Sequence, residues 1–294
     1  MAKVAFIGMG EAGSALITGW GLGTHDVRAY DIKTDTAATR DELLKRYSAL
    51  QINGADTLAE AMSDADLVIS TVTADQANGV AEAAAPHLNQ GSYFCDLNSC
   101  APSAKKKSAV AVEAAGARYV DVAVMSPVHP ALNTVPCLIA GPHAEAVKPI
   151  MDKLPMNTRI VPGDVGRAST IKMVRSVLIK GLEALTSEFM LAVSAADVAD
   201  EVLPSLALNY GDFDWDAQAT YNFERGMVHG VRRAAEMEEV AKTLTDLGLP
   251  NGITKATADW ERWLADVPVA PPANPKDTDA RALAAQILPH IQRG

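Results

Sequence analysis

Residues 4–13 read VAFIGMGEAG, an apolar run that leads into a glycine-rich turn. The apolar run predicts a short buried strand, and the glycines have the spacing G-x-G-x-x-G. In such a turn Gly8 permits the reversal, Gly10 lets a ligand approach the backbone, and Gly13 lets the next helix pack against the strand. The N-terminus of that helix attracts an anion. We expect this loop to bind the diphosphate of a dinucleotide rather than to be a turn without a ligand, through Gly8, Met9, Gly10, Glu11, Ala12 and Gly13.

A second predicted strand, over residues 27–31, ends in an acid, Asp31. A carboxylate at this point can accept hydrogen bonds from the adenosine ribose. It would also repel a 2′-phosphate, which favours NAD(H), although Lys33 could offset that repulsion and NADP(H) stays possible. The alternative interpretation is that Asp31 caps the turn that follows it.

The alternation of strands and helices continues to about residue 161 and predicts an α/β fold with a doubly wound parallel sheet. From Gly166 onward the pattern is only helical, beginning with a long helix over residues 168–195 and including separate helices over residues 215–223 and 232–247. We therefore expect an N-terminal Rossmann domain over residues 1–165 and an all-α substrate and dimerisation domain over residues 166–294. The long helix has an apolar face that so small a domain cannot bury fully, which predicts a homodimer. That face consists of Ile171, Val174, Leu178, Leu182, Leu185 and Phe189.

Composition excludes several other classes of protein. The chain has 294 residues and a net charge of −10, so no basic stripe is expected to follow a nucleic acid. The three consecutive lysines of residues 105–107 are interpreted as a solvated helix face. No apolar run approaches the ~20 residues of a membrane span, and no group of residues has metal-ligand spacing. The first residues lack the features of a signal peptide, so we expect a cytoplasmic protein that binds a small molecule.

Four further segments resemble the β-hydroxyacid dehydrogenase superfamily, the group of 3-hydroxyisobutyrate, tartronate-semialdehyde and 6-phosphogluconate dehydrogenase-like enzymes. Residues 70–73 (STVT) resemble the segment after the family's fourth main strand. Residues 96–102 (DLNSCAP) resemble its D-x-[ST]-[ST]-x-x-P stretch, and residues 121–127 (DVAVMSP) its substrate loop. The run from Gly163 through Lys172 to Ser176 corresponds to its catalytic segment. The C-terminal half resembles an atypical branch with a phosphogluconate dehydrogenase-like C-terminal domain.

The resemblance assigns roles to these segments and also shows two departures. The family's double glycine in the substrate loop is replaced by Ser126 and Pro127, and Pro127 has no N–H to offer a carboxylate. The family's asparagine after the lysine is replaced by Ser176. The resemblance implies that the cofactor contacts Thr71, Val72 and Thr73, and that the substrate contacts Ser99, Met125, Ser126, Pro127 and Ser176.

We expect an NAD(P)-dependent enzyme that transfers a hydride between the cofactor and the CH–OH or C=O of a hydroxy acid or a related alcohol. The alcohol proton needs an acceptor within hydrogen-bond reach, and the resemblance assigns this role to Lys172 rather than leaving it an exposed helix lysine. One alternative is an imine reductase, although such enzymes usually replace this lysine. Another is a protein that senses the dinucleotide without chemistry.

An arginine pair in the second half has two interpretations. Arg232 and Arg233 could bind a substrate carboxylate. They could instead pair with Glu236 and Glu239 in a surface network, which we favour.

Overall fold

The computed structural model describes residues 3–21 and 26–291 of the chain. They belong to two compact units, Met1–Val174 and Arg175–Gly294. The division falls inside the long helix α7 (Arg167–Ala195), whereas the sequence pattern changes just before this helix. Among the described residues, none of the helices combines the length and the apolar character that a membrane-crossing segment needs.

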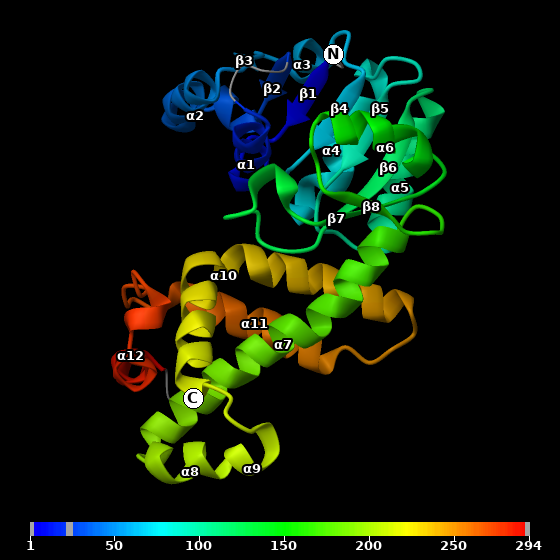
Figure 1. The fold of residues 1–294 in the computed structure, drawn as a ribbon. Coiled ribbons are helices and arrows are strands. Elements are labelled where there is room, and N and C mark those ends of the chain that lie inside the picture. The colour runs from blue at the N-terminus through cyan, green and yellow to red at the C-terminus, as the bar shows by residue number, and fades with distance from the viewer. Residues whose placement is uncertain (1–2, 22–25, 292–294) are drawn as a thin grey trace. The chain divides into compact units, whose positions relative to one another are not determined.

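An eight-stranded sheet forms the centre of the first unit (Figure 1). Neighbouring strands are parallel except for β6 and β7, which are antiparallel. The strand order reverses between β1 and β4, and ligands of open α/β sheets bind at the carboxyl ends of the strands near such a reversal. In spatial order the strands are β3 (Asn53–Gly54), β2 (Val27–Tyr30), β1 (Val4–Ile7), β4 (Leu67–Ser70), β5 (Tyr93–Asp96), β6 (Arg118–Val124), β7 (Cys137–Ala140) and β8 (Thr158–Ile160).

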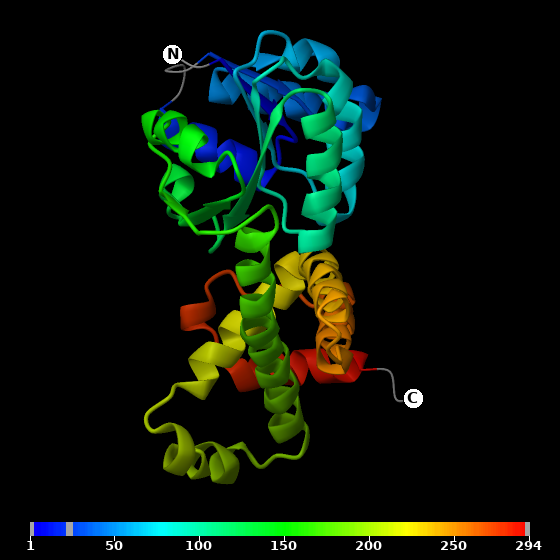
Figure 2. The same cartoon turned by 90° about the vertical axis from the view of Figure 1, so that its right-hand side faces the viewer.

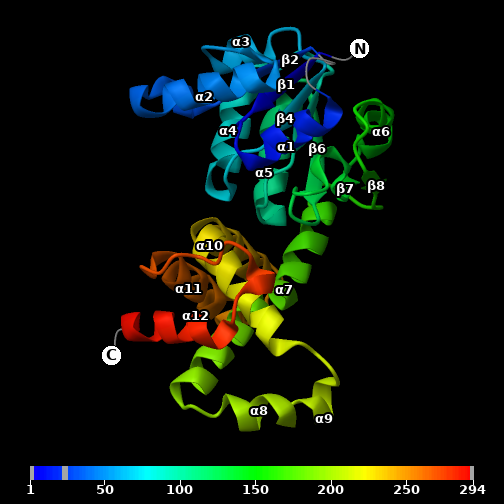
Figure 3. The ribbon, with the colours of Figure 1, turned by 60° about the vertical axis from the view of Figure 1, so that its left-hand side comes forward.

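Helices cover both faces of this sheet (Figures 1 and 3). Successive side chains of a strand point to opposite faces. Phe6 belongs to the core on the face that α1, α2 and α6 cover, and Ile7 belongs to the core on the face that α3, α4 and α5 cover. Both faces of β1 are therefore buried, which explains why its sequence is a continuous apolar run. The helices are α1 (Glu11–Trp20), α2 (Ala37–Leu50), α3 (Leu58–Met62), α4 (Ala77–Ala84), α5 (Pro102–Ala114) and α6 (Ala144–Lys153).

The described part of the second unit is helical, so the expected order of a Rossmann sheet and then an all-α region is confirmed. Its core includes Met190, Phe223, Leu264 and Leu283, which come from four different helices. After α7 follow α8 (Ala199–Ser205), α9 (Ala207–Tyr210), α10 (Trp215–Asp246), α11 (Gly252–Asp266) and α12 (Ala280–Ile287).

The prediction of two separate helices over residues 215–223 and 232–247 is wrong, because α10 is one continuous helix of 32 residues. It is bent rather than straight, and α11 packs along it (Figures 1 and 2). The intervening glycines are contact points and not helix breakers. A Cβ atom at Gly226 would lie 2.5 Å from Leu264, and one at Gly230 would lie 2.2 Å from the carbonyl oxygen of Glu261. Glycine therefore lets the backbones of α10 and α11 approach closely.

Candidate functional site

The predicted site residues of the first unit follow the carboxyl ends of neighbouring strands. Gly8 follows β1, Asp31 follows β2, Thr71 follows β4, Ser99 follows β5, and Met125 follows β6. The carboxyl ends of parallel strands lie at one edge of a sheet. The fold therefore brings the expected cofactor and substrate residues to the edge where the strand order reverses.

The glycine loop packs closely against the segment after β4. Gly8 has a φ of +87°, and a Cβ atom there would lie 2.7 Å from the carbonyl oxygen of Thr71. The Thr71 hydroxyl donates a hydrogen bond of 2.7 Å to the Gly8 carbonyl oxygen. At Gly13 a Cβ atom would lie 3.0 Å from that same oxygen. The contacts of the protein itself thus require glycine at Gly8 and leave little room for a side chain at Gly13.

The Asp31 carboxylate fastens the glycine loop to the end of β2. One oxygen accepts a hydrogen bond of 2.8 Å from the Met9 backbone N–H, and the other accepts one of 3.0 Å from the Lys33 N–H. The interpretation of Asp31 as a turn cap is therefore confirmed, and its contact with ribose stays a prediction. Met9 is completely buried, and its N–H and carbonyl oxygen bond to Asp31 and Arg46, so its contact with a ligand stays a prediction.

Arg46 also reaches this loop, and sequence reasoning missed it. Its guanidinium donates a hydrogen bond of 2.7 Å to the Met9 carbonyl oxygen and one of 2.8 Å to Glu42. The adjacent Tyr47 is buried. This burial, and to a smaller extent the negative charge of Asp31, raises the pKa of the Tyr47 hydroxyl. The apolar periodicity of α2 places Tyr47 on the buried face, but no spacing in the sequence connects Arg46 to the glycine loop.

Asn98 is a second residue that sequence reasoning missed. Its side-chain oxygen accepts a hydrogen bond of 2.7 Å from the Val72 N–H, and its amide nitrogen donates one of 3.0 Å to the Ser70 hydroxyl. Asn98 therefore fixes the segment after β4, which contains the expected cofactor residues Thr71, Val72 and Thr73, to the segment after β5.

Lys172 lies in the first turns of α7 and reaches the same edge. Its ammonium group donates a hydrogen bond of 2.5 Å to the Ser99 hydroxyl oxygen. It also lies near Cys137: burial raises the pKa of the Cys137 thiol to about 12, against a smaller opposing effect of the Lys172 charge. Lys172 is half-buried, so the alternative of an ordinary exposed helix lysine is not what the structure shows.

The remaining substrate candidates have different environments. Met125 is half-buried, and its N–H donates a hydrogen bond of 2.8 Å to the Pro136 carbonyl oxygen. Ser126 and Pro127 are exposed. Ser176 is buried and follows Lys172 by one helical turn in α7, and it belongs to the second unit.

The interpretation of the lysines at 105–107 as a solvated face is wrong for Lys105. Its side chain is completely buried, and its ammonium nitrogen lies 2.9 Å from an Asp96 carboxylate oxygen and 3.8 Å from one of Asp121. Asp96 and Asp121 are register partners on β5 and β6, so two carboxylates come together and need a cation between them. Lys106 and Lys107 are exposed, as expected.

The interpretation of Arg232 and Arg233 as a surface network is correct for Arg232 and wrong for Arg233. Arg232 pairs with Glu236 at 2.9 Å, which is one of the predicted partners. Arg233, by contrast, is buried and pairs with Glu261 at 2.8 Å and with Glu183. It therefore belongs to the interior of the second unit and not to a surface network.

Family comparison identifies the group of proteins that shares this architecture. Residues 3–162 match the family described as the NAD-binding domain of 6-phosphogluconate dehydrogenase, and residues 194–264 match a domain of unknown function. The first match covers more than half of the chain. The chain belongs to the β-hydroxyacid dehydrogenase superfamily. It is therefore an oxidoreductase of the NAD(P)-dependent hydroxyacid dehydrogenase type.

Individual relatives of this superfamily cover most of the chain. A conserved hypothetical protein from Sinorhizobium meliloti is 33% identical over 99% of this chain and 97% of its own, with a TM-score of 0.76. The 3-sulfolactaldehyde reductase of Escherichia coli is 25% identical to this chain, and the match covers 72% of each chain.

Two more distant structures show the fold alone. One is the Mycobacterium tuberculosis 3-hydroxyisobutyrate dehydrogenase with L-serine, which is 17% identical over 97% of this chain and 98% of its own, with a TM-score of 0.71. The other is a Myxococcus stipitatus imine reductase with NADP⁺, which is 18% identical over 97% of this chain and 99% of its own, with a TM-score of 0.53.

The residues at the glycine loop fit the nicotinamide dinucleotide of this superfamily. Gly10 has ordinary extended backbone angles, and a Cβ atom there would meet nothing within 4 Å. The packing of the protein itself therefore does not require glycine at this position, whereas a ligand approaching the backbone would. Glu11 and Ala12 begin α1, a helix of ten residues, and the free N–H groups of such a first turn suit an anion.

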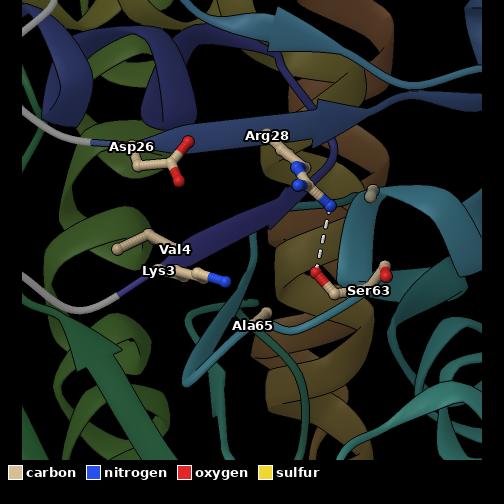
Figure 4. A pocket seen from close by; sticks show the side chains of 7 residues that line it. Lys3, Val4, Asp26, Arg28, Ser63 and Ala65 are labelled. Atoms are coloured by element: carbon tan, nitrogen blue, oxygen red, sulfur yellow. Dashed lines mark hydrogen bonds between the residues drawn. The ribbon is translucent and has the colours of Figure 1, made fainter.

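A small surface pocket at the opposite edge of the sheet is unrelated to this superfamily site. Figure 4 shows Lys3, Asp26 and Ser63 around it, and each of these residues precedes β1, β2 or β4. The pocket thus lies at the amino ends of the strands. Within residues 3–21 and 26–291, no His, Cys, Asp and Glu side chains gather in a group of three or more that could hold a metal ion.

Proposed function

We propose that this protein transfers a hydride between a nicotinamide dinucleotide and the CH–OH or C=O of a small hydroxy acid or related alcohol, with Lys172 as the general acid and base. The observation that carries this proposal is the hydrogen bond from the Lys172 ammonium to the Ser99 hydroxyl oxygen. It places an ionisable amine at the strand edge that also carries the glycine loop.

The proposed chemistry follows from what these two side chains can do. When bound, the coenzyme supplies the hydride acceptor for oxidation or the hydride donor for reduction. Oxidation of an alcohol also releases the hydroxyl proton, and the unprotonated Lys172 amine accepts it. In reduction the ammonium form returns a proton to the carbonyl oxygen. Ser99 orients the amine by accepting its hydrogen bond, and its own O–H can donate to the substrate oxygen.

The substrate class rests on the loop after β6 and on named relatives. We propose that Met125, Ser126 and Pro127 line the substrate, with Ser176 from α7 as a further polar contact. The names of two similar proteins specify small compounds with an acidic group, 3-sulfolactaldehyde and 3-hydroxyisobutyrate. We therefore expect a small anionic substrate. Because Pro127 offers no N–H, Ser126 is the proposed hydrogen-bond donor of the loop to the anionic group.

Asp31 supports NAD(H) as the preferred coenzyme, with NADP(H) as the alternative. Each Asp31 oxygen accepts one backbone hydrogen bond, and each has a second lone pair that can accept from a ribose hydroxyl. The negative charge disfavours a 2′-phosphate, while the exposed Lys33 side chain reduces that effect. Calorimetric titration of both coenzymes measures this preference directly.

Replacing the proposed acid and base tests the function. We expect Lys172→Ala to lower turnover by about 10²- to 10⁴-fold, the usual contribution of a positioned acid or base, with coenzyme affinity nearly unchanged. The control variant is Lys106→Ala, because Lys106 is an exposed lysine of α5. It should keep full turnover. Activity is followed by the absorbance of the reduced coenzyme on a panel of hydroxy acids, the matching aldehydes and aromatic alcohols.

Three other outcomes of this experiment would contradict the proposed function or the role of Lys172 in it. Full turnover by Lys172→Ala would reject the assigned role of the lysine. Turnover only with cyclic imines would identify an imine reductase. Tight coenzyme binding without hydride transfer to any compound would support a dinucleotide sensor.

We also propose that the protein is a homodimer that uses α7. Leu178, Leu182 and Leu185 recur at helical spacing on this helix, and their exposed fractions are 63%, 50% and 61%. An exposed apolar stripe of this kind is typical of an interface between chains.

A further inference from the structure

The Asp121 carboxylate holds the start of the helix that carries Lys172. One of its oxygens accepts hydrogen bonds from the backbone N–H groups of Gly166, at 3.0 Å, and Ser169, at 3.2 Å. The other oxygen accepts a hydrogen bond of 2.6 Å from the Ser169 hydroxyl. All three bonds are buried, and they connect β6 to residues 45 and 48 positions later in the chain.

These hydrogen bonds give a partner to backbone N–H groups that have none within the helix. The first N–H groups of a helix have no partner within it, and they carry its partial positive charge. A carboxylate fixed in a strand therefore sets where the first turn of α7 lies and how it is rotated. Lys172 follows Ser169 by three residues, which is less than one turn, so its direction is set by this anchor.

A buried carboxylate can perform this role only if its own charge is balanced. Asp121 and Asp96 share the buried Lys105 ammonium, at 3.8 and 2.9 Å. The Tyr119 hydroxyl donates a further hydrogen bond of 2.6 Å to Asp96. Removing the cation from such a group would leave uncompensated charge in the interior. Lys105 thus places a positive charge beside the Asp121 carboxylate that accepts bonds from α7.

We propose that Asp121 is a positioning residue for Lys172, acting through the first turn of α7, with Ser169 as its link and Lys105 as its counter-ion. Asp121 is not a catalytic residue, since its oxygens bond to the helix start. Strand β6 would then position two parts of the site. Its Asp121 holds the helix that carries Lys172, and the proposed substrate loop begins directly after the strand. The inference rests on the proposed function in so far as Lys172 is the acid and base.

A chemical labelling experiment tests this without substrate or coenzyme. The wild-type protein, Asp121→Asn and Ser169→Ala are labelled with trace acetic anhydride across a range of pH, and the acetylation of Lys172 is quantified by mass spectrometry against that of exposed Lys106. Loss of the anchor should change the relative reactivity of Lys172 on the order of threefold or more, equivalent to about half a unit in pKa.

The matched control is Tyr119→Phe, which removes a buried hydrogen bond from the same network but none to α7. It should lower the free energy of unfolding and leave the Lys172 labelling profile unchanged. An unchanged profile in both Asp121→Asn and Ser169→Ala would overturn the proposal, as would an equal change in Tyr119→Phe.

Kinetics separates this proposal from the proposed function. With a substrate found in the panel, Asp121→Asn should lower kcat by about tenfold through misplacement of the amine, while the KM of the coenzyme stays the same. If Lys172→Ala retains turnover, the proposed function fails, and the labelling result still decides whether Asp121 positions the lysine.

Discussion

At the residue scale, the glycines of the G-x-G-x-x-G motif have different structural roles. Gly8 has a backbone angle that other residues rarely adopt and close contacts with the segment after β4, whereas Gly10 has ordinary angles and open space around it. The motif predicted these separate roles, with the tight turn at Gly8, ligand approach at Gly10 and helix packing at Gly13. In the structure the protein's own packing constrains Gly8 and Gly13 but not Gly10, whose role toward a ligand stays a prediction.

Alanine substitutions at these two glycines should have separable effects. Gly10→Ala should change the free energy of unfolding by no more than about 0.5 kcal/mol, as is usual for a surface substitution, and weaken coenzyme binding, because the new methyl group occupies the space of the diphosphate. Gly8→Ala should lower the stability itself, because its Cβ atom would lie 2.7 Å from the Thr71 carbonyl oxygen. Chemical denaturation and calorimetric titration of both variants check this, and a Gly10→Ala protein that binds the coenzyme normally would contradict it.

Charged residues show where prediction from the sequence ends. Lys172 and Ser99 were both selected because a known motif surrounds them, and the structure brings them into contact. Lys105 was assigned to a solvated face because its two neighbours in the sequence are also lysines. Its burial depends on Asp96 and Asp121, which meet only when β5 and β6 pair, so no local pattern reveals it. Asn98 and Arg46 were missed for the same reason.

The buried lysine predicts a dependence of stability on pH. Burial by itself lowers the pKa of Lys105, but the charges of Asp96, Cys100 and Asp121 together raise it above the ordinary value. Its contribution to stability is therefore complete below the unfolded pKa of about 10.4 and is lost as pH rises through the folded value. Lys105→Met should cost about 3–5 kcal/mol at pH 8, as breaking a buried pair does, and should lose less stability than wild type between pH 10 and 12.

Urea unfolding at a series of pH values measures both effects. Lys106→Met is the control and should retain the wild-type loss at alkaline pH, because Lys106 is exposed. An equal alkaline loss in Lys105→Met and wild type would show that other groups cause it.

At the scale of elements, the strands of the sheet are well predicted from apolar runs. The strands β5 (Tyr93–Asp96) and β7 (Cys137–Ala140) belong to the predicted alternation of strands and helices, and turn residues enclose both short runs. The two-residue strand β3 was not predicted, since its exposed residues have no apolar pattern. Helix α10 was predicted as two helices, and only its packing on α11 shows why glycine stands between the two predicted segments.

Two helix glycines should respond to alanine in opposite directions. Gly230→Ala should destabilise the protein, because its Cβ atom would lie 2.2 Å from the Glu261 carbonyl oxygen. Gly181→Ala in α7 would meet nothing within 4 Å and should stabilise the protein by about 0.5–1 kcal/mol through helix propensity. Thermal and urea unfolding check both signs, and a stabilising Gly230→Ala would contradict the packing role of this glycine.

At the scale of the whole molecule, the sequence predicted the order of the two architectures and the family. It also predicted the apolar stripe on α7, whose leucines are exposed in a single chain. The substrate could not be predicted, because it depends on a loop in which Ser126 and Pro127 replace the family's glycines.

The stripe makes the oligomeric state testable. The wild-type protein should sediment as a dimer in analytical ultracentrifugation, and Leu182→Glu should shift it toward the monomer, because the substitution places a charge on the apolar surface. Leu208→Glu is the control, since Leu208 is also exposed and lies outside α7. A wild-type protein that stays monomeric at high concentration would refute the proposed dimer.

The antiparallel pairing of β6 and β7 has a consequence for how such enzymes diversify. Val124 and Cys137 are register partners, and the Met125 N–H bonds to the Pro136 carbonyl oxygen, so residues 125–136 leave and re-enter the sheet at the same point. Lengthening a loop whose ends are already fixed together adds only a small entropic cost. Insertions between residues 125 and 136 can therefore reshape the proposed substrate loop while the strands of the sheet keep their register.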